Sequence, residues 1–568
     1  MEKPKKILIV GGVAGGASAA ARIRRLDEHC EIIMFERGPD VSFSNCSLPF
    51  HLSGIVPKED DLLVIEPQEF YSQYRIEARV FNEVIDIDRD NKQVKVKNLK
   101  TEEEYIENYD KLILSPGANP IVPKFEGADL VNIFTIRNVA DISKLNNFIK
   151  DNNCQEITVI GGGFIGIEVA ENLRLANYNV TLIEAMPRIL RPFDYDMVQV
   201  LHKELIDKGV NLIVDDKVEK FEKDTVVLSS GKRIHAEAVI MAIGVRPETD
   251  LAEKADLEIG KTGAIAVNQS YQTSDKDIYA VGDAIEVYHK LLHDKTKLAL
   301  AGPAQKQARA AVDHIYGKDV SDIGVIGSSA IRVFNYNGAS TGLTEGFIKA
   351  TNMQINYDTI MIIPHDMVNI MPESEILFFK LIFEVPTGRI LGAQAIGKGN
   401  VDKRIDVIAT VIKFNGTLED LKDLELCYAP PFGTAKDVVN LAGLVGLNIL
   451  HNTFKQVHAK DVRALVEDNA YIIDIRGKES YDSAHIINAV NIPMDEIRDR
   501  LDEIPKDRPV YIQCRTGKSS YNVVMALQHL GFDNVYNVAG GILGLSFYEY
   551  YNDKVTGRKP ILTNYYFE

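Results

Sequence analysis

Short runs of Ile, Val and Leu alternate with helix-like stretches through the N-terminal half of the chain. Such apolar runs lie at residues 5–10, 31–36, 111–115, 156–161, 179–184 and 238–244. Short apolar runs bounded by glycines and helical patterns are typical of buried parallel strands. The alternation therefore predicts an α/β architecture.

One plan occurs twice in this region. Residues 5–36 and 156–184 both contain a strand, a Gly-rich turn, a helix and a second strand that ends in Glu. This arrangement is typical of Rossmann-like dinucleotide-binding domains. The repeat predicts two dinucleotide sites in one chain.

The pattern changes near residue 323. Shorter strand candidates at 329–334, 376–383 and 390–397 precede helical stretches at 406–414 and 435–450. We expect a separate α+β unit, a linker at 449–456 and a last α/β unit over 457–552.

Charge and cysteine usage narrow the class of protein. The chain has 64 Lys+Arg and 81 Asp+Glu, a net charge of −17, which argues against a nucleic-acid or anionic-membrane partner. No apolar run approaches the roughly 18 residues of a membrane span, and no signal-peptide pattern precedes the first strand. The five cysteines form no CxxC pair, which argues against a metal site or a disulfide framework. We expect a cytoplasmic protein.

The first Gly-rich turn consists of Gly11, Gly12, Val13, Ala14, Gly15 and Gly16. Glycines let the backbone approach a pyrophosphate, and the N-terminus of the next helix supplies N–H groups and positive potential. Glu36 follows about 20 residues later, where a carboxylate accepts from ribose hydroxyls. Val13 replaces the middle glycine of the usual motif, and we expect Gly12 and Gly15 to compensate.

The second turn holds Gly161, Gly163 and Gly166, and Glu184 ends the following strand. An acid at this position favours NADH, because a 2′-phosphate would meet a like charge. The nearby Arg188 leaves NADPH open. A turn that binds nothing is the alternative for a single such motif, but two copies with strand, helix and acid in place favour binding.

A third segment, residues 278–284, includes Asp283. Together with the first turn it resembles the second flavin-contacting motif of flavoproteins with two dinucleotide domains, in which the Asp accepts a hydrogen bond from the ribityl chain of FAD. Residues 115–117 and 242–247 resemble the domain-crossing connections of that family. The resemblance implies FAD at the first site and a nicotinamide at the second.

A single cysteine, Cys46, lies in the loop 42–50 after the second strand. A lone cysteine near a flavin works through a mixed disulfide, a sulfenate or a persulfide. We expect a helix end or the flavin site to favour its thiolate. A buried structural cysteine is the alternative. We expect Cys30, Cys154 and Cys427 to be packing residues.

These segments resemble coenzyme A disulfide reductases, the single-cysteine branch of the pyridine nucleotide-disulfide oxidoreductases. The resemblance implies that Cys46 alternates between a thiolate and a mixed disulfide with coenzyme A, and that Tyr428 belongs to the catalytic set. It also implies substrate-binding roles for Arg22, Arg25, Ser42, Asn45 and Lys436. For Arg22 and Arg25 an exposed helix face is the alternative.

Two positions depart from that resemblance. Where the family often has two tyrosines before a proline, this chain has Ile370-Met371-Pro372, as related NADH oxidases and peroxidases do. The first Gly-rich turn has Ala14 and lacks the histidine of the peroxidase type. An NADH oxidase that reduces oxygen through a Cys46 sulfenate therefore stays open.

The last unit resembles a rhodanese domain. It contains Asp474-Ile475-Arg476, the run 484–493 and the loop Cys514-Arg515-Thr516-Gly517-Lys518-Ser519-Ser520 between a strand and a helix. Such a loop is an anion nest, and Arg515 and Lys518 add positive charge. The resemblance implies that Cys514 carries a persulfide. A cysteine phosphatase loop and an inactive rhodanese fold are the alternatives.

Taken together, the chain resembles fusions of a coenzyme A disulfide reductase with a rhodanese domain, also described as NADH-dependent persulfide reductases. The implied fold has two Rossmann-like dinucleotide-binding domains, an α+β dimerisation domain and a C-terminal α/β rhodanese domain. The expected boundaries are 1–115 and 248–322 for FAD binding, 116–247 for NAD(P)H, 323–448 for dimerisation, 449–456 for the linker and 457–552 for the rhodanese domain.

The expected cofactors and substrates are FAD, NADH and small thiols or persulfides, with coenzyme A as substrate or bound adduct. A homodimer is expected, with no metal. A slow redox or sulfur sensor that binds a partner protein is an alternative of another class.

Overall fold

The computed structural model describes residues 4–320 and 324–567. The chain forms two compact units, one of residues 1–187 and 213–325 and the other of residues 188–212 and 326–568. Within the described residues, no helix is both long and apolar enough to cross a bilayer.

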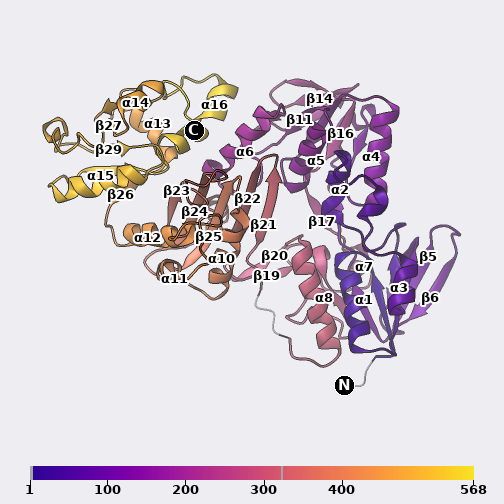
Figure 1. Ribbon diagram of the computed structural model, residues 1–568. Helices are drawn as coiled ribbons and strands as arrows, with labels where there is room; N and C mark the ends of the chain where they lie inside the picture. The colour runs from indigo at the N-terminus through magenta and orange to yellow at the C-terminus, as the bar shows by residue number, and fades with distance from the viewer. Residues whose placement is uncertain (1–3, 321–323, 568) are drawn as a thin grey trace. The chain divides into compact units, whose positions relative to one another are not determined.

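The first sheet of the first unit is parallel, with strand order β18-β7-β1-β2-β3. Its strands are β1 (Lys6–Val10), β2 (Glu31–Glu36), β3 (Glu77–Val80), β7 (Lys111–Leu114) and β18 (Ile278–Ala280). Ile7, Leu8 and Ile9 have no exposed surface, which explains why this strand is apolar on both faces. Helices α1 (Ala14–Leu26) and α8 (Ala301–Ile315) pack against each other (Figure 1).

A second parallel sheet contains β11-β10-β16-β9 in that order. Its strands and helices are β9 (Ile133–Phe134), β10 (Glu156–Ile160), β11 (Asn179–Ile183), β16 (Ala238–Met241), α4 (Val139–Asp151) and α5 (Phe164–Leu175). The repeat read from the sequence thus corresponds to two parallel sheets. The α/β prediction is confirmed.

Smaller elements complete the first unit. Antiparallel sheets form from β4 (Asn82–Asp88), β5 (Gln93–Asn98) and β6 (Glu104–Asn108), from β13 (Val218–Glu222), β14 (Thr225–Leu228) and β15 (Arg233–His235), from β8 (Ala118–Pro120) and β17 (Val245–Pro247), and from β19 (Val287–His289) and β20 (Asp294–Thr296). Short helices are α2 (Leu48–Leu52), α3 (Pro67–Tyr74) and α7 (Asp250–Lys254).

The second unit begins with an antiparallel sheet of order β21-β22-β25-β24-β23. Its strands are β21 (Ser328–Val333), β22 (Tyr336–Gly342), β23 (Tyr357–Ile362), β24 (Leu377–Glu384) and β25 (Ile390–Gly397), and its helices are α9 (Glu345–Ala350), α10 (Val401–Lys413), α11 (Leu418–Asp423) and α12 (Val438–Leu450). Helix α10 packs on β22 and β25, and α12 packs on α11 and β23. This is the α+β unit expected after residue 323.

A parallel sheet of order β26-β30-β29-β27-β28 follows. It is built from β26 (Lys455–Val457), β27 (Tyr471–Asp474), β28 (Val490–Asn491), β29 (Val510–Gln513) and β30 (Val535–Val538), with α13 (Ala459–Glu467), α14 (Lys478–Ser483), α15 (Lys518–His529) and α16 (Gly541–Thr556). Helix α12 ends at Leu450 and β26 starts at Lys455, so regular structure continues into both ends of the expected linker.

Helix α6 (Tyr195–Asp207) packs against α16. The buried His202 ring lies edge-on to Tyr551, with centroids 4.8 Å apart, and the Tyr195 hydroxyl accepts a hydrogen bond from Asn552 at 2.6 Å. Residues after α16 fold back, since the Phe567 ring lies 4.9 Å from Phe547.

Candidate active site

The first Gly-rich turn is packed too tightly for side chains. A Cβ on Gly11, whose φ is +93°, would lie 2.0 Å from the Ser115 carbonyl oxygen, and one on Gly16 would lie 1.8 Å from the Gly11 carbonyl oxygen. Glu36 closes the turn, because its Oε2 accepts from the Gly12 N–H at 3.0 Å. The backbone here lies at the start of α1, as an anion site requires.

The second turn shows a division of roles among its glycines. Added Cβ atoms would lie 2.4 Å from the Ala242 carbonyl oxygen at Gly161 and 1.9 Å from the Gly161 carbonyl oxygen at Gly166, whereas Gly163 faces open space. The Glu184 carboxylate accepts from the Gly162 N–H at 2.7 Å. An open middle glycine at a helix N-terminus suits close approach of a pyrophosphate, and each carboxylate oxygen retains a lone pair for a ribose hydroxyl.

Asp283 lies two residues after Val281, whose side chain would lie 3.0 Å from a Cβ on Gly15 of the first turn. It follows Gly282, whose φ is +81° and whose N–H donates to Gln307 Oε1 at 2.8 Å. Burial raises the pKa of Asp283, and Arg137 acts in the opposite direction. The first turn, Glu36 and Asp283 are groups that fit a flavin dinucleotide.

Backbone pairing ties the Cys46 loop to the first turn. The Ser42 N–H donates to the Gly12 carbonyl at 2.8 Å, and Ser42 adopts a positive φ of 49°. Asn45 and Cys46 form a single 3-10 turn that runs into α2. Cys46 is exposed, so the buried structural alternative is wrong for this residue.

The protein groups around Cys46 do not favour its thiolate. Loss of surrounding water is the first cause that raises the pKa of Cys46 above 9.0, and the charges of Glu168 and Asp283 raise it further. These side chains therefore do not stabilise the thiolate, and stabilisation by a helix end or by the flavin site stays a prediction. The two carboxylates act in the same direction as burial, because like charge disfavours a second anion.

Glu168 was not singled out by the sequence. It lies on α5, and burial, with a smaller contribution from Glu171, raises the pKa of Glu168 to about 7. The sequence feature that could have identified Glu168 is its place on the helix after a Gly-rich turn.

The two arginines of the predicted basic face of α1 have different environments. Arg22 donates to Asp313 of α8 at 2.8 Å, whereas Arg25 is exposed.

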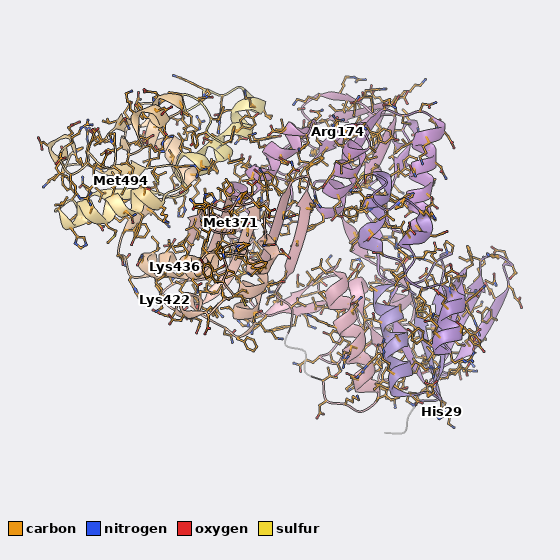
Figure 2. All side chains as sticks on the ribbon, viewed as in Figure 1. His29, Arg174, Met371, Lys422, Lys436 and Met494 are labelled. Carbon is orange, nitrogen blue, oxygen red and sulfur yellow. The ribbon has the colours of Figure 1, made fainter. Side chains whose placement is uncertain are left out.

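In the second unit, Tyr428 is 50% exposed and Lys436 is exposed as well. Figure 2 labels Lys436. Tyr428 and Lys436 lie on one connection, between α11 and α12.

The exposure of Cys427 contradicts another prediction. We expected it to be a packing residue like Cys30 and Cys154, which are buried, but Cys427 is exposed. It lies in the irregular connection between α11 and α12, where no strand or helix pattern fixes the direction of a side chain.

The Cys514 loop is held between two helix N-termini. The Cys514 side chain is buried, and its Sγ accepts the Gly517 N–H at 3.2 Å and the Ser520 hydroxyl at 3.3 Å. At the start of α16, the Ile542 N–H donates to the Cys514 carbonyl at 3.0 Å. Gly541 allows this approach, since a Cβ there would lie 2.4 Å from that carbonyl oxygen. These donors suit an anionic sulfur.

Side chains around this loop differ in exposure. Lys518 is exposed and Arg515 is partly buried. Ser520 has no exposed surface and was not singled out by the sequence as a partner of the sulfur. The sequence feature that could have identified Ser520 is its place in the first turn of α15, after the Gly517 cap.

Comparison with known proteins agrees with this geometry. Residues 5–308 match the family described as pyridine nucleotide-disulphide oxidoreductase, residues 328–438 its dimerisation domain, and residues 458–546 the rhodanese-like domain. Coenzyme A disulfide reductase of Staphylococcus aureus strain JH9 is 34% identical over 439 residues, which are 77% of this chain and 99% of that protein.

Solved structures extend the likeness to the last domain. Reduced CoADR-RHD of Bacillus anthracis has 41% identity and a TM-score of 0.93, covering 96% of this chain and 98% of that one. An NAD-dependent persulfide reductase from A. fulgidus has 33% identity and a TM-score of 0.89, covering 94% and 99%. The water-forming NADH oxidase of Lactobacillus brevis has 28% identity and a TM-score of 0.75, covering 79% and 99%. With two Gly-rich turns, an exposed loop cysteine and a second cysteine between helix N-termini, this chain belongs to the pyridine nucleotide-disulphide oxidoreductases and carries a C-terminal rhodanese-like domain.

Proposed function

We propose that this enzyme uses NADH to reduce coenzyme A persulfide, polysulfide or coenzyme A disulfide through Cys46, and that Cys514 handles sulfane sulfur. The observation that carries the proposal is the presence in one chain of an exposed cysteine beside a dinucleotide turn and a second cysteine whose sulfur accepts two hydrogen bonds. The relatives named as coenzyme A disulfide reductase and persulfide reductase support it.

The two Gly-rich turns and their carboxylates form the proposed cofactor sites. The first turn, Glu36 and Asp283 would hold FAD, which supplies two-electron transfer between a nicotinamide and sulfur. The second turn and Glu184 would hold NADH, and the carboxylate disfavours a 2′-phosphate. NADPH is the weaker candidate.

The Cys46 thiolate attacks the inner sulfur of coenzyme A persulfide, which is the sulfur bonded to carbon. The S–S bond breaks, HS⁻ leaves, and a mixed disulfide joins Cys46 to coenzyme A. Two electrons from NADH then break this disulfide, which regenerates the Cys46 thiolate and releases coenzyme A thiol. For each persulfide, one NADH and one proton yield one thiol, one hydrogen sulfide and NAD⁺.

Cys514 would accept a sulfane sulfur from a donor, with Arg515 and Lys518 attracting the anionic donor. Coenzyme A thiol or another small thiol would carry this sulfur to Cys46. Arg22, Arg25, Ser42, Asn45, Tyr428 and Lys436 complete the proposed substrate set. Since Tyr428 is half exposed and Ile370 is 82% exposed, we include a homodimer in the proposal, with apolar and aromatic groups of this domain covered by a second copy.

The test is anaerobic and measures hydrogen sulfide released per NADH oxidised, with coenzyme A persulfide as acceptor. A ratio near one supports persulfide reduction, and NADH loss without sulfide rejects it. Cys46→Ser should abolish turnover while NADH still bleaches the flavin absorbance. Cys514→Ser should leave the turnover of free coenzyme A persulfide unchanged and remove thiosulfate- or polysulfide-dependent sulfur transfer.

A second candidate function is NADH oxidation by oxygen through a Cys46 sulfenate. The observation in its favour is Ile370-Met371-Pro372, together with the likeness to the Lactobacillus brevis oxidase. It requires rapid aerobic NADH consumption without any sulfur acceptor. Negligible turnover with every small acceptor would instead support the sensor role.

A further inference from the structure

Arg404 lies on the inner face of α10 and is 1% exposed. Its Nη1 donates to the Asn400 carbonyl at 2.8 Å. Its Nη2 donates to the Asp366 carbonyl at 2.6 Å and to Asp437 Oδ2 at 3.1 Å. A buried guanidinium requires such partners, because an unpaired buried charge is costly.

Asp366 belongs to the base of the connection between β23 and β24. The Asp366 N–H donates to the Glu375 carbonyl at 2.9 Å, and the Glu375 N–H donates back to Asp366 Oδ1 at 3.0 Å. These two bonds close the base of a loop whose far end carries Ile370 and Met371, and Ile370 is 82% exposed. Figure 2 labels Met371.

Asp437 ends the connection between α11 and α12. It is the N-cap of α12, where its Oδ1 accepts the Val439 N–H at 3.1 Å. The residues just before it include Tyr428, Phe432 and Lys436, and Phe432 is 63% exposed. A single guanidinium therefore bonds two loops that are far apart in the sequence.

The Asp366 side chain packs closely against Gly399. A Cβ on Gly399 would lie 1.8 Å from Asp366 Oδ2, so the Asp366 carboxylate occupies this place only because residue 399 has no side chain. The planar guanidinium presents several N–H groups in a fixed fork, whereas a lysine ammonium is a point charge on a flexible stem. Lysine at 404 would keep the charge and lose the fixed geometry of the two contacts.

We propose that Arg404 is a positioning residue that sets the spacing between the Ile370–Met371 loop and the Tyr428–Lys436 loop, and thereby the fit of the coenzyme A arm. This inference rests on the proposed function, which gives Tyr428 and Lys436 to the substrate. Arg404 itself is buried and touches no substrate. It acts through Asp366 and Asp437.

The test compares Arg404→Lys and Asp437→Asn with Lys403→Gln, an exposed neighbour on the same helix. Asp437→Asn keeps a good N-cap residue and removes only the charge partner of Arg404. Two steps are measured separately in the full-length holoenzyme: bleaching of the flavin by NADH, and anaerobic turnover with coenzyme A persulfide.

We expect both variants to keep the rate of flavin bleaching. The KM for coenzyme A persulfide should rise about tenfold to a hundredfold, because small displacements of positioning groups have effects of this size. Lys403→Gln should match the wild type in both steps.

Unchanged KM in both variants would overturn the inference. A parallel loss of both steps, or insoluble protein from both variants beside soluble Lys403→Gln, would assign Arg404 to folding alone and overturn it as well. Wild-type protein that releases no sulfide from coenzyme A persulfide would reject the proposed function instead, so the two failures are distinguishable.

Discussion

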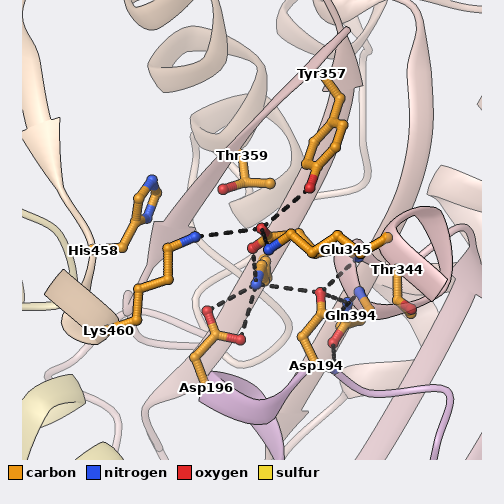
Figure 3. A network of polar contacts seen from close by, with 12 residues as sticks. Asp194, Asp196, Thr344, Glu345, Tyr357, Thr359, Gln394, His458 and Lys460 are labelled. Atoms are coloured by element: carbon orange, nitrogen blue, oxygen red, sulfur yellow. Dashed lines mark hydrogen bonds and ion pairs between the residues drawn. The ribbon is translucent and has the colours of Figure 1, made fainter. Parts of the chain in front are cut away.

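Lys380 Nζ lies 2.7 Å from Glu345 Oε1, and the lysine side chain is 2% exposed. Asp196 and Asp194 also pair with this ammonium, at 2.8 and 3.2 Å. Figure 3 shows the network, in which Lys460 of α13 also points toward Glu345. The cluster therefore joins the start of α6, helix α9, the antiparallel sheet and the rhodanese-like domain within the second unit.

Loss of this buried ammonium should be costly. We expect Lys380→Met to lower the free energy of unfolding by about 3–5 kcal/mol, since it leaves buried carboxylates without a partner. Lys349→Met is the matched control, because Lys349 pairs with the same Glu345 but is 62% exposed; its cost should be below about 1 kcal/mol. Urea unfolding followed by circular dichroism measures both, and equal losses would contradict the argument.

His202 predicts a pH dependence of stability. Complete burial, with Arg188 nearby, lowers the pKa of His202 to about 3 from 6.5. The unfolded chain then binds a proton that the folded chain does not, so this stability is full above pH 6.5 and is lost as the pH falls toward 3. The slope from one such group is at most about 1.4 kcal/mol per pH unit.

His202→Gln should flatten the fall in unfolding free energy between pH 6.5 and pH 4 relative to the wild type. Its side-chain oxygen can still accept the Ile189 N–H that His202 Nε2 accepts at 3.3 Å. His29→Gln, at an exposed position labelled in Figure 2, should leave the slope unchanged. Identical slopes in all three proteins would show that His202 is not a source of the pH dependence.

Ser520 should matter to sulfur transfer at Cys514. Its hydroxyl donates to the sulfur at 3.3 Å, and a hydrogen bond to a charged group contributes about 1.5–3 kcal/mol. We expect Ser520→Ala to slow thiosulfate-dependent sulfur transfer by about tenfold or more. Ser519→Ala, at the exposed neighbouring position, should have no effect. A normal rate in Ser520→Ala would show that this donor does not stabilise the reacting sulfur.

Glu168 should contribute to the raised pKa of Cys46. Burial raises this pKa most and the charge of Glu168 raises it further, so Glu168→Gln should let the thiolate form at lower pH. The measurement is the pH dependence of iodoacetamide alkylation in a Cys427→Ser background, because Cys427 is exposed too. The exposed Glu103→Gln substitution serves as control. A midpoint that stays in place, or moves to higher pH, would refute this electrostatic role.

Strands, Gly-rich turns and the two candidate redox cysteines could be predicted from the sequence. The apolar runs at 5–10 and 156–161 became β1 and β10, because strand formation and turn chemistry depend on residues that are neighbours in the chain. The same holds for Gly517 and the start of α15. Cys427 was misjudged, since an irregular connection carries no periodicity from which burial can be inferred.

The partners of Arg404 could not be predicted from the helical pattern around it. It occupies an inward position beside Val401, Ile405 and Ile408, so an arginine on an apolar stripe was visible in the sequence. Its partners Asp366 and Asp437 lie on other connections, and no local rule selects them.

Local sequence was enough to place the strands, the glycine turns and the loops of the two candidate redox cysteines. The direction of the shift in the pKa of Cys46 and the pairing of Lys380 with Glu345 follow from the folded chain instead. Burial and charge pairing act through space, between groups such as Asp194 and Lys380 that come together only when the chain folds.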